Sequence, residues 1–211
     1  MSLLKFENVK KVYVMKPVIE NFNLTVERGE VVRLEGPNGS GKTTIIKMAC
    51  GLERPTSGKV LLEGIPPWKP KAKSKIGAVL HVNITYPDLT VRENLEFFSK
   101  LYKADFEFAK ELAERVGLWD RKDQRASELS FGWRKRLELV RALLHKPSLV
   151  VLDEPFVGLD KRGREDVLKL LREALSWNSS IIYTSPTGAT EFSITENERV
   201  VTLKPVEVYE R

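Results

Sequence analysis

The sequence has 211 residues, of which 42% are hydrophobic and 30% charged, and its formal net charge is +6. These values exclude a disordered chain and fit one sizeable domain of the soluble globular class. The surplus of basic residues could serve nucleic acid, an anionic membrane or phosphate ligands, but a solvated surface rich in lysine is the simpler interpretation. A single cysteine, Cys50, excludes an internal disulfide and favours a cytosolic setting.

Strands dominate the first part of the chain. The run "NFNLTVERGEVVRLEG" predicts two strands around the turn at Arg28-Gly29, and "GKVLLEG" and "KIGAVLHV" predict two more. Between the last two lies "IPPWKPKAKSK", whose three prolines predict a loop without regular structure.

A mainly helical block follows over about residues 87–126. Thr90 is the predicted cap of its first helix, with Glu93 as capping-box partner. A second helix is predicted over 106–116, ending at Gly117, and a third over 130–144, ending before Pro147.

The last part returns to alternating strands and helices. "SLVVLDEP" predicts a buried parallel strand, residues 161–175 a helix, "SIIYTS" another strand, and "RVVTLKPVEVYE" a terminal strand pair. Strand–helix alternation at both ends, with a helical block between, indicates an α/β fold with a parallel sheet and an inserted helical subdomain.

The stretch "GPNGSGKTT" reads as a phosphate cradle because it fits the pattern G-x-x-x-x-G-K-[ST]. Glycines let main-chain N–H groups turn towards an anion, and the following helix adds its positive end. The cradle residues are Gly36, Pro37, Asn38, Gly39, Ser40, Gly41, Lys42, Thr43 and Thr44. Lys42 would reach the β- and γ-phosphates, and Thr43 would bind Mg²⁺. The apolar strand before the loop and the helical run after it argue against an ordinary glycine-rich turn.

Two adjacent carboxylates end the predicted strand in "LVVLDEP". Asp153 suits the magnesium position of a phosphate-cradle protein, and Glu154 could take a proton from an attacking water. Such pairs are often merely hydrated at strand ends, but the presence of the cradle favours the chemical interpretation.

The motif set resembles that of the ATP-binding cassette ATPases, the nucleotide-hydrolysing subunits of ABC transporters. It comprises "GPNGSGKTT", the short motif at Leu129, "LVVLDEP" and "GLD", and the resemblance spans about residues 3–191. It implies one domain over residues 1–211: a P-loop NTPase core with a parallel sheet and flanking helices, an N-terminal antiparallel β part, and a helical subdomain inserted at about 87–135.

The resemblance also implies ligands and partners. ATP and Mg²⁺ would lie between the cradle of one cassette and the signature motif of a second, head to tail. Ser130 and Gly132 match the signature residues that contact the partner's γ-phosphate, and Tyr13 matches an aromatic that stacks on adenine, although an edge-strand packing role is the alternative. Arg136 and Arg141 match basic positions of the signature helix; a solvated or core-capping role is the simpler interpretation.

Three departures from the family pattern predict slow hydrolysis. Phe131 and Trp133 replace a glycine and a glutamine of the signature. His81 stands where a glutamine touches Mg²⁺ and the attacking water; its imidazole could substitute in part, or the residue could simply pack at a strand end. Pro186 replaces a histidine that contacts the γ-phosphate and has no side-chain donor.

The expected partners are a second cassette, identical or different, and a separate transmembrane subunit; nucleic acid is not expected. No stretch approaches the roughly 18 apolar residues of a membrane span. We therefore expect a cytoplasmic protein, peripheral on the inner face of the cell membrane. The alternative is a degenerate ATP-binding clamp paired with a catalytically complete cassette.

Overall fold

The computed structural model describes residues 2–187 and 193–206. Within these ranges the strands are β1 (Ser2–Tyr13), β2 (Lys16–Glu27), β3 (Val31–Glu35), β4 (Ser57–Leu62), β5 (Ile76–Val79), β6 (Leu149–Leu152), β7 (Ser180–Ser185) and β8 (Arg199–Thr202). The α-helices are α1 (Lys42–Ala49), α2 (Pro70–Lys73), α3 (Val91–Tyr102), α4 (Phe106–Arg115), α5 (Phe131–Leu143) and α6 (Lys161–Ser176). Two 3₁₀ turns, Trp119–Arg121 and Ala126–Glu128, precede α5.

Two sheets organise these elements. A five-stranded sheet has the order β5-β6-β7-β3-β8, in which every neighbouring pair is parallel. A three-stranded antiparallel sheet has the order β2-β1-β4. The two strands predicted around Arg28-Gly29 are therefore both present, but the turn carries the chain from one sheet to the other. The predicted α/β fold, with a parallel core and an N-terminal antiparallel part, is confirmed.

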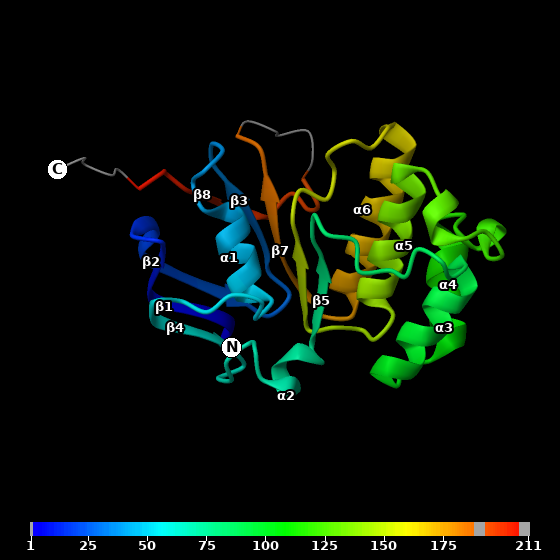
Figure 1. Cartoon of the computed structure of the whole chain (residues 1–211), viewed down its shortest axis with the longest axis horizontal. Coiled ribbons are helices and arrows are strands. Elements are labelled where there is room, and N and C mark those ends of the chain that lie inside the picture. The colour runs from blue at the N-terminus through cyan, green and yellow to red at the C-terminus, as the bar shows by residue number, and fades with distance from the viewer. Residues whose placement is uncertain (1, 188–192, 207–211) are drawn as a thin grey trace.

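Alternating side chains of the parallel sheet build two hydrophobic cores. Val31, Ile181 and Tyr183 pack with the helices α3 to α6, whereas Val32 and Ile182 pack with α1 and the antiparallel sheet. Figure 1 shows the consequence: α1 lies between the two sheets, and α5 and α6 cover the opposite face of the parallel sheet. Because both faces are covered, β6 is buried along its whole length.

The helical block packs as the outermost layer beyond α5 (Figure 1). Its first helix has the predicted capping box, since the Thr90 hydroxyl accepts from Glu93 N–H and the Glu93 carboxylate accepts from Thr90 N–H. Its second helix ends at Arg115 with Val116 as the C-cap, after which Gly117 takes the positive φ of 67° that glycine allows. The boundary of a separate subdomain at 87–135 stays a prediction, because α3 and α4 share one core with α5 and α6.

Local expectations differ from the structure in two places. The lysine-rich loop contains the single-turn helix α2, which Pro70 begins rather than prevents, because the first helical position needs no hydrogen-bonded N–H. The terminal strand pair is represented by β8 alone among the described residues, and residues 207–211 lie outside them. In the described ranges, no helix combines the length and apolarity required to cross a bilayer.

Cys50 is buried and His145 is half-buried, and both side chains are neutral. Burial raises the pKa of the Cys50 thiol to about 12, as suits a small residue that packs as an apolar group. From the sequence alone, the place of His145 at the end of a predicted helix indicates a helix-terminal cation or a surface residue. In the structure its ring is instead stacked on Tyr102 with ring centroids 4.1 Å apart. Burial lowers the pKa of His145 to about 4, so the cationic interpretation is wrong.

This burial predicts a loss of stability in mild acid. A histidine in an unfolded chain has a pKa of about 6.5. Between about pH 6.5 and 4, His145 is therefore protonated in the unfolded chain but neutral in the folded chain. The contribution of neutral His145 to the free energy of unfolding is fully present above about pH 6.5 and is lost as the pH falls. Between pH 7 and 4.5, we expect the free energy of unfolding in urea to fall by about 2 kcal/mol less in His145→Phe than in the wild type. An equal fall in the free energy of unfolding in the two proteins would contradict this prediction.

Candidate functional site

The carboxyl ends of four parallel strands meet at one edge of the sheet. The cradle follows β3, His81 lies two residues beyond the end of β5, Asp153 and Glu154 follow β6, and Thr184 is the next-to-last residue of β7. In parallel sheets this edge is where ligands bind. The structure therefore brings together the predicted cradle, acid pair and His81, although the cradle and the acid pair lie more than 100 residues apart in the chain.

Glycines let the cradle turn tightly. Gly41, which precedes α1, has a φ of 90°, a conformation that costs a residue with a Cβ atom. A Cβ atom at Gly36 would lie 2.6 Å from the carbonyl oxygen of Leu203 and 2.6 Å from the hydroxyl of Ser40. The loop can take this shape only with glycine at these positions.

Lys42 is the first residue of α1 and is only 7% exposed. Its ammonium donates to the carbonyl oxygens of Gly36 at 2.6 Å and Pro37 at 3.1 Å. Among the described residues, the buried hydroxyl of Ser40 has no hydrogen-bond partner. A buried cation held by neutral carbonyls, an unsatisfied hydroxyl and the positive end of a helix together fit a phosphate group.

The acid pair is anchored by β7. Asp153 is 2% exposed, and its carboxylate accepts a hydrogen bond from the Thr184 hydroxyl at 2.7 Å. Its other oxygen lies 3.2 Å from His81 Nε2. Sequence reasoning missed Thr184; the register that pairs Leu152 with Tyr183 places the next two residues side by side, and that register depends on a strand order the sequence does not reveal.

Magnesium fits this edge only together with a phosphate. No group of three or more His, Cys, Asp or Glu side chains is placed to hold a metal ion within the described ranges. Mg²⁺ commonly takes one or two protein ligands and completes its shell with phosphate oxygens and water. Asp153 and Thr43 could supply such a pair if a nucleotide supplied the rest.

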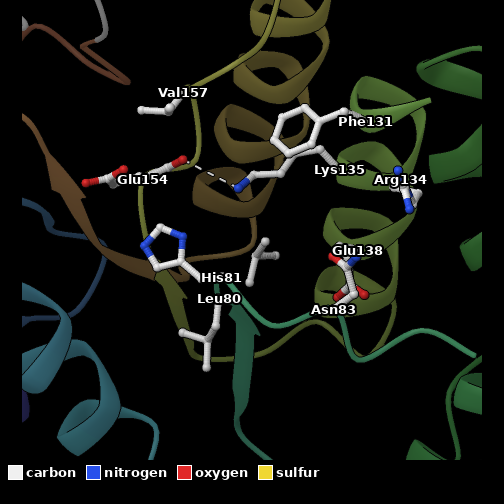
Figure 2. Close-up of a pocket in the computed structure, with 10 residues that line it drawn as sticks. Leu80, His81, Asn83, Phe131, Arg134, Lys135, Glu138, Glu154 and Val157 are labelled. Atoms are coloured by element: carbon white, nitrogen blue, oxygen red, sulfur yellow. Dashed lines mark hydrogen bonds between the residues drawn. The ribbon is translucent and has the colours of Figure 1, made fainter. Parts of the chain in front are cut away.

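Glu154 and His81 line a cavity of about 190 Å³ between α5 and the loops that follow β5 and β6 (Figure 2). Lys135 reaches into it from α5, and its ammonium donates to the main-chain oxygen of Glu154 at 3.4 Å. Sequence reasoning missed Lys135, since a lysine beside Arg136 on a helix gives no sign of facing inwards.

A buried ion pair holds the loop after His81 against α5. The Glu138 carboxylate accepts from the N–H groups of Ile84 and Thr85, both at 2.8 Å, and from the guanidinium of Arg141 at 2.8 Å. Arg136 binds the carboxylate of Asp166 on α6 in the same buried manner. Both arginines therefore have the core-capping role, not the solvated one.

The predicted signature residues line a different cavity, of about 350 Å³. Ser130 is the N-cap of α5, and Gly132 follows in its first turn. The ring of Phe131 covers Gly158, where an added Cβ atom would lie 2.9 Å from it. Trp133 is held between the guanidinium groups of Arg121 and Arg136, which lie 4.4 and 4.3 Å from its ring. Trp133 is half-buried in these contacts, whereas Phe131 is still 54% exposed.

Tyr13, the last residue of β1, is not among the residues that line the cavity beside Asn38 and Gly39. Its ring lies beside the Lys11 ammonium, 4.7 Å from the ring centroid. The cavity beside Asn38 and Gly39 is instead walled by residues 14–18 of the β1–β2 hairpin. An adenine-stacking role for Tyr13 stays a prediction.

Comparisons with known proteins agree with this geometry. The sequence model of the ABC transporter family matches residues 19–157, more than half of the chain. The linearmycin resistance ATP-binding protein LnrL of Bacillus subtilis is 38% identical over 87% of this chain and 61% of its own length. The Nod factor export ATP-binding protein I of Cupriavidus metallidurans is 36% identical over 87% of this chain and 63% of its own. The chain thus spans less than two thirds of these relatives.

Solved structures show the same fold. A dimeric ATP-binding cassette in a post-hydrolysis state with ADP and Pi superposes with a TM-score of 0.84 at 26% identity, covering 96% of this chain and 94% of that one. A dimeric bacterial ABC transporter cassette gives a TM-score of 0.82 at 27% identity, with coverage of 95% and 94%. This chain belongs to the ABC transporter family and has the fold of its ATP-binding cassettes.

Proposed function

We propose that this chain is the ATP-binding and ATP-hydrolysing subunit of an ABC membrane transporter and works as a head-to-tail dimer. The observation that carries the proposal is the separation of two half-sites. The cradle and the acid pair meet at one edge of the sheet, whereas Ser130 and Gly132 line a different cavity beside residues 158–160. A second cassette would complete each site, as the dimeric structural relatives support.

The cradle, the acid pair and His81 have separate roles in the proposed hydrolysis. The cradle amides and Lys42 bind and orient the phosphates, and Asp153 and Thr43 hold Mg²⁺. Bound Mg²⁺ neutralises charge on the transferred phosphoryl group. Glu154 takes the proton of the attacking water, and His81, beside Asp153, helps to orient that water.

Hydrolysis by this chain is expected to be slow. Pro186 is exposed and offers no donor to a γ-phosphate. Loss of one such contact costs about a hundredfold in rate. The general base and the magnesium residues are retained, so slow turnover rather than none follows.

The membrane subunit has a candidate docking surface beside the loop after His81. Val82, Ile84, Tyr86, Phe97 and Leu101 are large apolar side chains with exposed fractions between 39% and 74%. Tyr86 and Phe97 also pack edge to face, with ring centroids 4.9 Å apart. We propose that an apolar cytoplasmic segment of the membrane subunit binds here, which places this chain on the inner face of the membrane. The relatives named as Nod factor export ATP-binding proteins support export as the direction.

A charge on this surface should weaken docking. We expect Leu101→Asp to reduce co-purification with the transmembrane subunit in detergent by about tenfold, because docking would bury a carboxylate among apolar groups. Leu52→Asp is the matched control, since Leu52 and Leu101 are 59% and 60% exposed but Leu52 lies outside the surface. Equal recovery of both variants would contradict the assigned surface.

Removal of the general base tests the proposed function directly. We expect Glu154→Gln to lower ATP hydrolysis by about a hundredfold while ATP binding is kept, because the amide cannot accept the proton. The variant should also accumulate as an ATP-dependent dimer in size-exclusion chromatography. A wild type without ATPase activity would refute hydrolysis, and a variant that stays monomeric with saturating ATP would refute self-association.

A further inference from the structure

Glu154 has an unfavourable backbone conformation. Its φ is 48°, in the left-handed region that residues with a Cβ atom seldom adopt. It also precedes Pro155, and a following proline favours an extended conformation. Two independent preferences therefore oppose the observed geometry, so surrounding contacts must impose it.

Donors and acceptors on both sides hold the main chain of Glu154. Its N–H donates to the Thr184 hydroxyl at 2.8 Å, and the same hydroxyl donates to the Asp153 carboxylate at 2.7 Å. Its carbonyl oxygen accepts from Val157 N–H and from Lys135 Nζ, both at 3.4 Å. The residue is thus fixed between β7 and α5.

Lys135 is an unusual residue for this purpose, because its ammonium lies largely inside the protein. Burial lowers its pKa, while the nearby carboxylates of Asp153, Glu138 and Glu154 favour its charged form. Figure 2 shows the side chain extending from α5 across the cavity to the Glu154 main chain. A half-buried lysine aimed at a carbonyl is a costly way to fill space, so a positional role accounts for it better than packing does.

We propose that Lys135 is a positioning residue for hydrolysis: together with Thr184, it holds Glu154 in its left-handed conformation and so directs the Glu154 carboxylate towards the attacking water. This inference rests on the proposed function. Lys135 acts through the main chain of Glu154 and does not touch the nucleotide. It also connects α5, whose first turn carries the signature, to the base of the same cassette.

Lys135→Met removes the donor and keeps the length of the side chain. In single-turnover hydrolysis at saturating Mg-ATP, we expect the rate to fall by about tenfold to a hundredfold because a displaced base loses much of its effect. The KM for ATP should stay within about twofold, since the cradle is untouched. Lys135→Arg, which restores a cationic donor, should recover most of the rate. Lys169→Met is the control for charge removal, because Lys169 is 68% exposed on α6.

A double-mutant cycle separates this role from a structural one. If Lys135 works through the Glu154 carboxylate, Lys135→Met should cause no further loss in a Glu154→Gln background. An equal loss in both backgrounds, or an unchanged rate in Lys135→Met alone, would overturn the inference and leave the proposed function standing. Absence of hydrolysis in the wild type would overturn both. If Lys135→Met does not fold, Lys135→Gln, which keeps a neutral donor, replaces it in the same cycle.

Discussion

The contact between the Lys42 ammonium and the carbonyl oxygens of Gly36 and Pro37 is the interaction on which the site depends. A nearly buried cation with two neutral partners is stable only where the surroundings already favour charge, and here the loop supplies it with oriented dipoles. The glycines of this loop let main-chain N–H groups turn towards an anion. Its shape requires glycine at positions 36 and 41, and its direction is set by β3 behind it and α1 ahead.

The order of the strands turns this cradle into a larger site. Because β7 lies between β3 and β6, Thr184 stands next to Asp153, and its hydroxyl links Asp153 to the main chain of Glu154. Because β5 is the neighbour of β6, His81 reaches Asp153 from the other side. Helix α5 lines the cavity beside Glu154, and Ser130 and Gly132 at its start line a different cavity. The cradle and the acid pair therefore meet at one edge of the sheet while the signature motif faces a separate cavity, which is the arrangement that the proposed dimer needs.

Local sequence patterns predicted the features that depend on the conformational preferences of a few neighbouring residues. The cradle glycines, the capping box at Thr90 and Glu93, and the glycine that ends α4 follow from backbone preferences over a few residues. Longer-range features were not predictable in this way. His145 looks like a helix-terminal cation in the sequence, but it packs against Tyr102 of α3, and burial lowers the pKa of its imidazole so that the ring is neutral. Lys135 and Thr184 acquire their roles only from strand order and from the face that α5 presents, and the position of Tyr13 depends on the hairpin that carries it.

Thermal unfolding with and without Mg-ATP is the most direct test of the central claim. Ligand that binds only the folded state stabilises it by about 2.7 kcal/mol at a hundred times its Kd, which raises the Tm by several degrees for a domain of this size. The account predicts such a rise for the wild type and none for Lys42→Ala, with the two proteins having comparable Tm values when no nucleotide is present. An equal rise in the variant, or no rise in the wild type at millimolar Mg-ATP, would contradict it.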